Sequence, residues 1–265
     1  MPLLEGYEEF QNVSPALQWA IFIVGCLILV AAVIATGVSI WLWTKYVKFN
    51  RMKNSCGLSG GEVARKVLDE NGLKNINVST WGSLIFGNSY SHYFHKVRIR
   101  RLTKNQKSLT SMAIGAEKSA LAIMDKEGDK DMRQRVALTP FIYFGPFAFI
   151  PLLVLGIVLD IIFFNFNGAV TIGSAVVGIV LYVISFVLSI KVLKTEVKAQ
   201  KRACEILKAN GMATDAEIAN MQELFHLYNI QYVIDIIIAL LQMIMKALEI
   251  AAKFQNGNGK NSIND

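Results

Sequence analysis

Residues Ala16 to Trp43 read ALQWAIFIVGCLILVAAVIATGVSIWLW and contain no charged side chain. As a helix this run would be about 42 Å long, which exceeds the roughly 30 Å thickness of a bilayer's hydrocarbon core. Trp19 near one end and Trp41 near the other fit the aromatic belts found where a helix crosses the membrane surface. The run therefore predicts a transmembrane helix.

The composition agrees with a membrane protein that also has an aqueous part. The chain has 265 residues, and 53% of them are apolar. Its cysteines, Cys26, Cys56 and Cys204, lie far apart. This spacing favours neither a disulfide framework nor a cysteine-based zinc site.

The distribution of charge predicts the orientation of the chain. Residues 45–136 contain 18 Lys and Arg against 8 Asp and Glu, whereas residues 1–15 contain three glutamates and no Lys or Arg. Because cytosolic loops carry the excess of basic residues, we expect the amino terminus outside and residues 45–136 in the cytosol. The formal charge of +7 could also suggest nucleic acid, but no binding motif accompanies it.

Three further apolar runs follow, at 140–164, 169–190 and 228–250. Pro146 and Pro151 should kink or break the first of them. The third contains Asp235, Lys246 and Glu249, so it predicts either a fourth span or an interfacial amphipathic helix. The expected domains are a tail (1–15), spans at 16–43, 140–164 and 169–190, a cytosolic domain (45–136), a cytosolic helical segment (191–227), a span or interfacial helix (228–250) and a disordered tail (251–265).

Smaller elements are expected within the cytosolic part. Residues 58–73 predict an amphipathic helix that begins with a capping box of Ser59 and Glu62. Residues 75–81 and 96–102 predict strands, and residues 106–124 predict a helix.

The run Cys56-Gly-Leu-Ser-Gly-Gly-Glu-Val-Ala-Arg-Lys-Val-Leu-Asp-Glu-Asn-Gly-Leu73 resembles a segment of the bacterial membrane zinc metallopeptidases of the YugP type (neutral zinc metallopeptidase). The resemblance covers about residues 40–250 and includes His92-Tyr93 and the stretch from Arg133 to Pro140. It implies a mainly α multi-pass membrane protein with about four transmembrane helices and a cytosolic zincin-like α+β domain.

The resemblance also places the family's His-Glu-x-x-His motif, in which two histidines bind zinc and the glutamate is the general base. The five positions here read Ala116-Glu117-Lys118-Ser119-Ala120, so Ala116 and Ala120 stand at the histidine positions and Glu117 at the base. Glu196 matches the family's third ligand. The motif is therefore expected to be degenerate, with no catalytic residue, no metal and no cofactor.

Without zinc, Glu117 and Glu196 should repel each other if they still converge, which would raise one pKa or recruit a lysine or arginine. Lys118 and Ser119 are expected to be ordinary polar positions of the helix. His92 and His95 are expected to be solvated or structural, and Asp160 to be an interfacial residue of its span.

These expectations predict an inactive membrane pseudopeptidase in the bacterial plasma (inner) membrane, which acts as a scaffold, adaptor or client-binding subunit of a membrane protein complex. Its partners would be other membrane proteins, such as an active family relative, together with anionic lipid and no nucleic acid. The alternatives are an active metallopeptidase with noncanonical ligands, or a lipid-binding protein that shapes the membrane.

Overall fold

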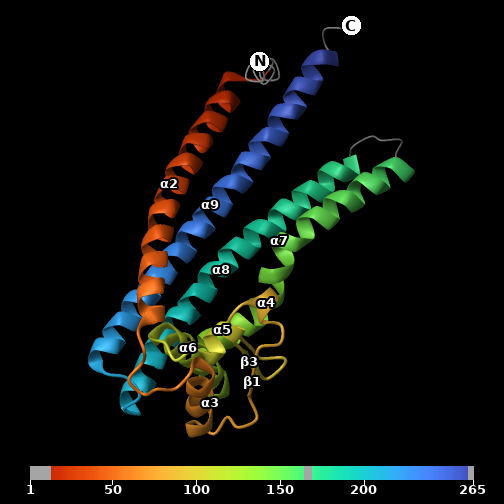
Figure 1. Ribbon diagram of the computed structural model, residues 1–265. Coiled ribbons are helices and arrows are strands. Elements are labelled where there is room, and N and C mark those ends of the chain that lie inside the picture. The colour runs from red at the N-terminus through yellow and green to blue at the C-terminus, as the bar shows by residue number, and fades with distance from the viewer. Residues whose placement is uncertain (1–12, 164–168, 262–265) are drawn as a thin grey trace. The chain divides into compact units, whose positions relative to one another are not determined.

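The computed structural model describes residues 13–163 and 169–261, in two compact units. Unit 1 comprises the described parts of 1–38 and 233–265, and unit 2 comprises Ser39–Tyr232. Most of the expected external tail (1–15) and the connection between the expected spans at 140–164 and 169–190 lie outside the described residues. The elements in chain order are α2 (Pro15–Arg51), α3 (Gly60–Glu70), β1 (Asn77–Ser79), α4 (Ser83–Phe86), β2 (Ser89–Ser91), β3 (Lys96–Arg98), α5 (Arg101–Asn105), α6 (Leu109–Lys126), α7 (Lys130–Phe163), α8 (Ala169–Ala209) and α9 (Asp215–Asn261) (Figure 1).

The chain is mainly helical with a small sheet, as predicted. Among the described residues, two helices are long and apolar enough to cross a membrane, Pro15–Arg51 and Ala169–Ala209, and Pro151–Phe163 is a shorter apolar helical stretch. The expected spans at 140–164 and 228–250 therefore stay predictions. α9 continues to Asn261, where the sequence predicts disorder from residue 251. Alanines and lysine after residue 250 favour the helical backbone and extend α9.

α6 lies at the centre of unit 2, where it packs against α3 and α8. Leu109, Met112 and Leu121 on α6 are almost completely buried. The contact with α3 is very close, because a Cβ atom on Gly115 would lie 2.3 Å from the carbonyl oxygen of Gly60. Two glycines thus allow the two backbones to touch.

The capping box predicted at the start of α3 is confirmed. The Ser59 hydroxyl accepts a hydrogen bond from the Glu62 backbone N–H, and the Glu62 carboxylate accepts one from the Ser59 N–H. The reciprocal bonds satisfy backbone donors that a helix start leaves open.

The sheet has the strand order β1-β3-β2, with β1 parallel and β2 antiparallel to β3. β1 and β3 lie within the predicted strands, whereas the sequence analysis did not predict β2. Val97 on β3 pairs with Val78 on one side and Tyr90 on the other. Val97 and Tyr90 are buried, so the sheet joins the core through these side chains.

α7 and α8 lie side by side (Figure 1). The backbone of α7 stays helical through Pro146 and Pro151, so the predicted break does not occur. A proline removes only one backbone donor, and the rest of the helix holds. Asp160 is buried and accepts hydrogen bonds from the first backbone N–H groups of α8, at Val170 and Thr171, so it caps α8 and is not a surface residue of its helix.

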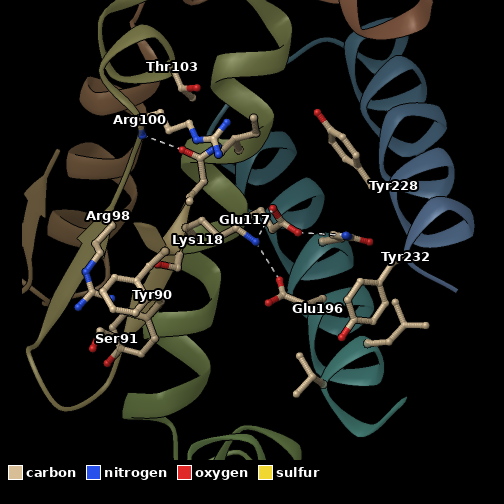
Figure 2. Close-up of a pocket in the computed structure, with 18 of the residues that line it drawn as sticks. Tyr90, Ser91, Arg98, Arg100, Thr103, Glu117, Lys118, Glu196, Tyr228 and Tyr232 are labelled. Atoms are coloured by element: carbon tan, nitrogen blue, oxygen red, sulfur yellow. Dashed lines mark hydrogen bonds and ion pairs between the residues drawn. The ribbon is translucent and has the colours of Figure 1, made fainter. Parts of the chain in front are cut away.

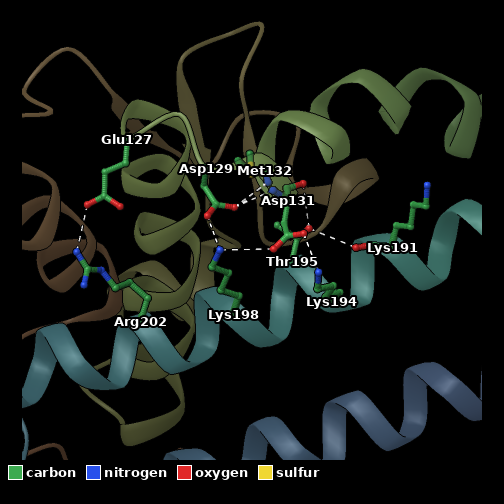
Figure 3. A network of polar contacts seen from close by, with 9 residues as sticks. All are labelled: Glu127, Asp129, Asp131, Met132, Lys191, Lys194, Thr195, Lys198 and Arg202. Atoms are coloured by element: carbon green, nitrogen blue, oxygen red, sulfur yellow. Dashed lines mark hydrogen bonds and ion pairs between the residues drawn. The ribbon is translucent and has the colours of Figure 1, made fainter.

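The turn between α6 and α7 is tied to α8 by ion pairs (Figure 3). Lys194 lies 3.0 Å from Asp131, and Lys198 bridges Asp129 and Asp131. Asp129 also accepts hydrogen bonds from backbone N–H groups in the first turn of α7, including that of Met132. These contacts fix α7 and α8 next to α6 at the point where the site forms.

Candidate functional site

Unit 2 contains a pocket of about 1170 Å³. It is lined by residues from the carboxy-terminal part of α2, from β2 and α6, and from α7, α8 and α9 (Figure 2). Without the two histidines of the motif, the sequence predicts either a collapsed pocket or a small polar cavity. The observed pocket is larger than this prediction. Its wall is rich in aromatic side chains: Trp43, Tyr46, Phe86, Tyr90, Tyr93, Phe94, Tyr228 and Tyr232.

A cluster of four charged side chains lies in this pocket. Lys118 Nζ is 3.0 Å from Glu117 Oε2 and 2.9 Å from Glu196 Oε2, and Arg135 Nη2 is 2.5 Å from Glu196 Oε1. Gln200 Nε2 donates to Glu117 Oε1 at 3.0 Å. Figure 2 shows Glu117 and Lys118 on α6 facing Glu196 on α8. The two glutamates converge on Lys118, so the conditional prediction that convergence would recruit a lysine or arginine is confirmed.

Burial and charge set the protonation of the cluster. Burial raises the pKa of Glu117 by more than the Lys118 ammonium lowers it. Burial also opposes ionisation of Glu196, but Lys118 and Arg135 hold the pKa of Glu196 below its ordinary value. Burial disfavours the charge on Lys118, yet the two carboxylates outweigh it and raise the pKa of the ammonium. The surroundings therefore favour the charged form of Lys118 and of Glu196, whereas burial favours the protonated form of Glu117.

A second polar group lies beside the cluster. Asp125 Oδ2 accepts a hydrogen bond from the Tyr90 hydroxyl at 2.6 Å and lies 2.6 Å from His92 Nδ1. Burial, helped by Asp125, raises the pKa of Tyr90, so its hydroxyl stays protonated. His92 thus lines the pocket with a carboxylate partner, while His95 lies outside the pocket lining on a turn with φ of 43°.

The structure places the two motif alanines away from the cavity. Ala116 and Ala120 are fully buried in the hydrophobic core, and neither lines the pocket. The expectation that Lys118 is an ordinary polar position is wrong, because its side chain is buried between two carboxylates. Ser119 is buried and donates to a backbone carbonyl. The sequence analysis did not identify Lys118, Arg135 and Gln200 as partners of the two glutamates. The signal for such partners is Glu196 itself, because a carboxylate on the apolar stripe of a helix needs a cation or hydrogen-bond donors.

The sequence comparisons cover both the apolar helices and the pocket. Residues 22–251 match the family described as "Putative neutral zinc metallopeptidase". The chain belongs to this family. It is also 24% identical over 237 residues to "Putative membrane protease YugP" of Bacillus subtilis (strain 168), across 86% of this chain and 96% of that relative. No solved structure matches.

Membership of this peptidase family corrects one expectation. The sequence analysis predicts that the chain is not an enzyme, whereas the family and the relative are both named as peptidases, which points to an enzyme. The prediction of a pseudoenzyme is therefore wrong on these comparisons, and the resemblance on which the family was recognised is confirmed.

The residues of the pocket do not fit the zinc ion that the family name implies. Lys118 holds its ammonium within hydrogen-bonding distance of both Glu117 and Glu196, where a second cation would be repelled. Within 13–163 and 169–261, no group of three His, Cys, Asp or Glu side chains could hold a metal. Zinc sites in proteins use such nitrogen, sulfur and carboxylate donors, so no reaction step is assigned to zinc here.

Proposed function

We propose that the pocket binds an extended polypeptide segment, and that the chain serves as a client-binding or adaptor subunit in a membrane protein complex. The observation that carries the proposal is the position of β2. Ser89, Tyr90 and Ser91 all line the pocket, and β2 pairs only with β3 among the described strands. An edge strand next to a cavity can accept an extended peptide as a further strand.

The chemistry of the pocket supports the same ligand. About 1170 Å³ exceeds the usual range for a small molecule and leaves room for several residues. Arg135 Nη1 is buried without a hydrogen-bond partner among the described residues, so a carbonyl or carboxylate of a bound segment could accept its hydrogen bond. The aromatic wall would contact the apolar side chains of that segment.

The long apolar helices favour clients that are themselves membrane proteins. Val192 and Leu193 line the pocket and lie two and three residues beyond the apolar run at 169–190. The proposed setting is the bacterial plasma membrane, with several spans, the amino terminus outside and residues 45–136 in the cytosol. The excess of basic residues in 45–136 supports this orientation.

Site-specific photo-cross-linking in native membranes tests client binding. A photoreactive amino acid at Ser89 or Ser91 should cross-link one client segment at positions two residues apart, because alternate residues of paired strands face the same side. The same group at the exposed Lys208 is the matched control. Cross-links at 89 and 91 that are no more frequent than at 208, or that map to unrelated segments, would contradict strand addition.

The family assignment favours a second candidate, a peptidase that uses ligands other than two histidines. The purified full chain would be assayed on casein with and without a chelator, and its zinc content measured. Stoichiometric zinc together with turnover that is lost in chelator and in Glu117→Gln would support this candidate. Cleavage that is equal in Glu117→Gln would point to a contaminating protease.

A further inference from the structure

Unit 2 exposes a group of large apolar side chains on two neighbouring turns. Leu84 and Ile85 on α4 are 92% and 83% exposed. The others are Trp81, Phe86, Tyr93 and Phe94, which we call, together with Leu84 and Ile85, the apolar tip. Large apolar side chains gathered on a soluble surface mark a contact with another molecule or with a membrane.

Basic residues contact the apolar tip, and of these Arg98 is itself buried. Residues 71–116 contain seven Lys and Arg and no Asp or Glu. Lys96 Nζ lies 5.1 Å from the centre of the Trp81 ring, and the Arg98 guanidinium lies 4.9 Å from that of Phe86. Arg100 and Arg101 follow with exposed side chains. The surface around the tip is therefore complementary to an anionic partner.

The apolar tip borders the same pocket as the end of a membrane helix. Phe86 and Phe94 line the pocket together with Val192 and Leu193, which follow Lys191 at the end of the apolar run of α8. Val192 is two residues from the end of that run, about 3 Å along the helix axis. If α8 crosses the bilayer, the tip lies at the level of the lipid headgroups.

We infer that the apolar tip and its basic surround dock on the anionic lipid surface of the membrane that holds α8. Aromatic and aliphatic side chains at the tip enter the interface, and Arg100 and Arg101 contact lipid phosphates. Because the chain is tethered to this membrane, the lipid surface is at high effective concentration next to the tip, which favours lipid over a diffusing protein. The inference does not depend on the client-binding function.

Spin labelling of the full chain in lipid nanodiscs tests the inference. In a variant without native cysteines, a nitroxide is placed at Leu84 or, as the control, at Lys208. Lys208 is exposed and lies 18 residues beyond the apolar run of α8. Power saturation then compares collisions with oxygen, which concentrates in lipid, with collisions with a water-soluble nickel complex.

In nanodiscs of phosphatidylglycerol and phosphatidylcholine, the label at 84 should favour oxygen and the label at 208 should favour nickel. The preference at 84 should fall in phosphatidylcholine alone and in Arg100→Gln/Arg101→Gln. Nickel access at 84 as high as at 208, an oxygen preference unchanged in phosphatidylcholine alone, or protection of 84 from both reagents by a protein contact would each overturn the inference.

Discussion

Lys118 bridges two carboxylates that the fold brings together in a buried pocket. Adjacent helix positions do not normally face each other, but the long lysine side chain spans from Glu117 on its own helix to Glu196 on α8. Arg135 adds a second cation on Glu196. The cluster thus holds α6, α7 and α8 together by charges that need no metal ion.

Lys118→Met should destabilise unit 2, because it leaves Glu117 and Glu196 buried without their shared cation. Removal of one partner from a buried ion pair costs roughly 3 kcal/mol or more. Denaturant unfolding of the full chain in detergent measures the loss. Lys208→Met, at an exposed lysine, is the matched control and should change the free energy of unfolding by less than about 0.5 kcal/mol. An equal effect in both variants would contradict the role of Lys118.

At the scale of residues, the sequence predicts that Glu196 needs a cationic partner, but it does not predict which residue provides the charge. Glu196 on an apolar helix stripe requires a partner, and its convergence with Glu117 follows from the resemblance. Lys118, Arg135 and Gln200 come from three helices whose mutual packing no local pattern encodes. The contacts of Asp160 were missed for the same reason, because its carboxylate oxygens accept hydrogen bonds from backbone N–H groups at the start of a different helix.

Among the elements, α3 and α6 depend on two glycines at their contact. Gly115→Ala should destabilise the chain by roughly 2 kcal/mol, because its Cβ would lie 2.3 Å from the Gly60 carbonyl oxygen and the two helices would have to separate. Gly173→Ala on α8 is the control, since its Cβ would meet nothing within 4 Å. Thermal unfolding should show a loss for the first variant only. A stable Gly115→Ala protein would mean that the helices are not packed this closely.

The start of α9 is tied to the segment after α2 by Glu217. Its carboxylate accepts hydrogen bonds from the Ser55 N–H at 2.7 Å and the Thr214 N–H at 2.8 Å. Burial alone would raise the pKa of Glu217, but the bonds from Ser55 and Thr214 hold it below the ordinary value of 4.5. A lowered pKa means that ionised Glu217 stabilises the fold above about pH 4.5 and that this stabilisation is lost as the pH falls further.

Glu217→Gln should therefore cost roughly 2 kcal/mol at neutral pH, the scale of hydrogen bonds to a charged group. Urea unfolding at a series of pH values should show the difference from wild type shrinking as the pH falls below about 4.5, because native Glu217 progressively loses its charge there. Glu205→Gln, at an exposed carboxylate of α8, controls for the general effect of removing a charge. A difference independent of pH would show that the amide, and not the lost charge, is responsible.

Hydrophobic periodicity predicts most of the elements. The long apolar runs and the capping box of α3 are read directly from the sequence, because burial and capping are local requirements. β2 was missed because Ser-Tyr-Ser is too short and too polar to resemble a strand. It forms because Val97 on β3 pairs with Tyr90, a contact that depends on the fold.

At the scale of the whole molecule, the proposed topology and the proposed docking of the apolar tip involve the same face of the membrane. The pocket in unit 2 borders both the tip and the end of the apolar run of α8. In the proposed topology, a client segment reaches the pocket from the membrane interface.

Single cysteines in a variant without native cysteines test the orientation in intact bacterial cells. With the amino terminus outside and four spans, Gln11 and Asn256 lie outside the cell and Lys208 lies in the cytosolic segment 191–227. An impermeant maleimide should therefore label a cysteine at position 11 or 256 and should not label one at position 208. Permeabilised cells are the control, in which Lys208→Cys must become reactive. Labelling at 11 without labelling at 256 would make 228–250 an interfacial helix. Labelling at 208 in intact cells would invert the topology and place the pocket outside the cell.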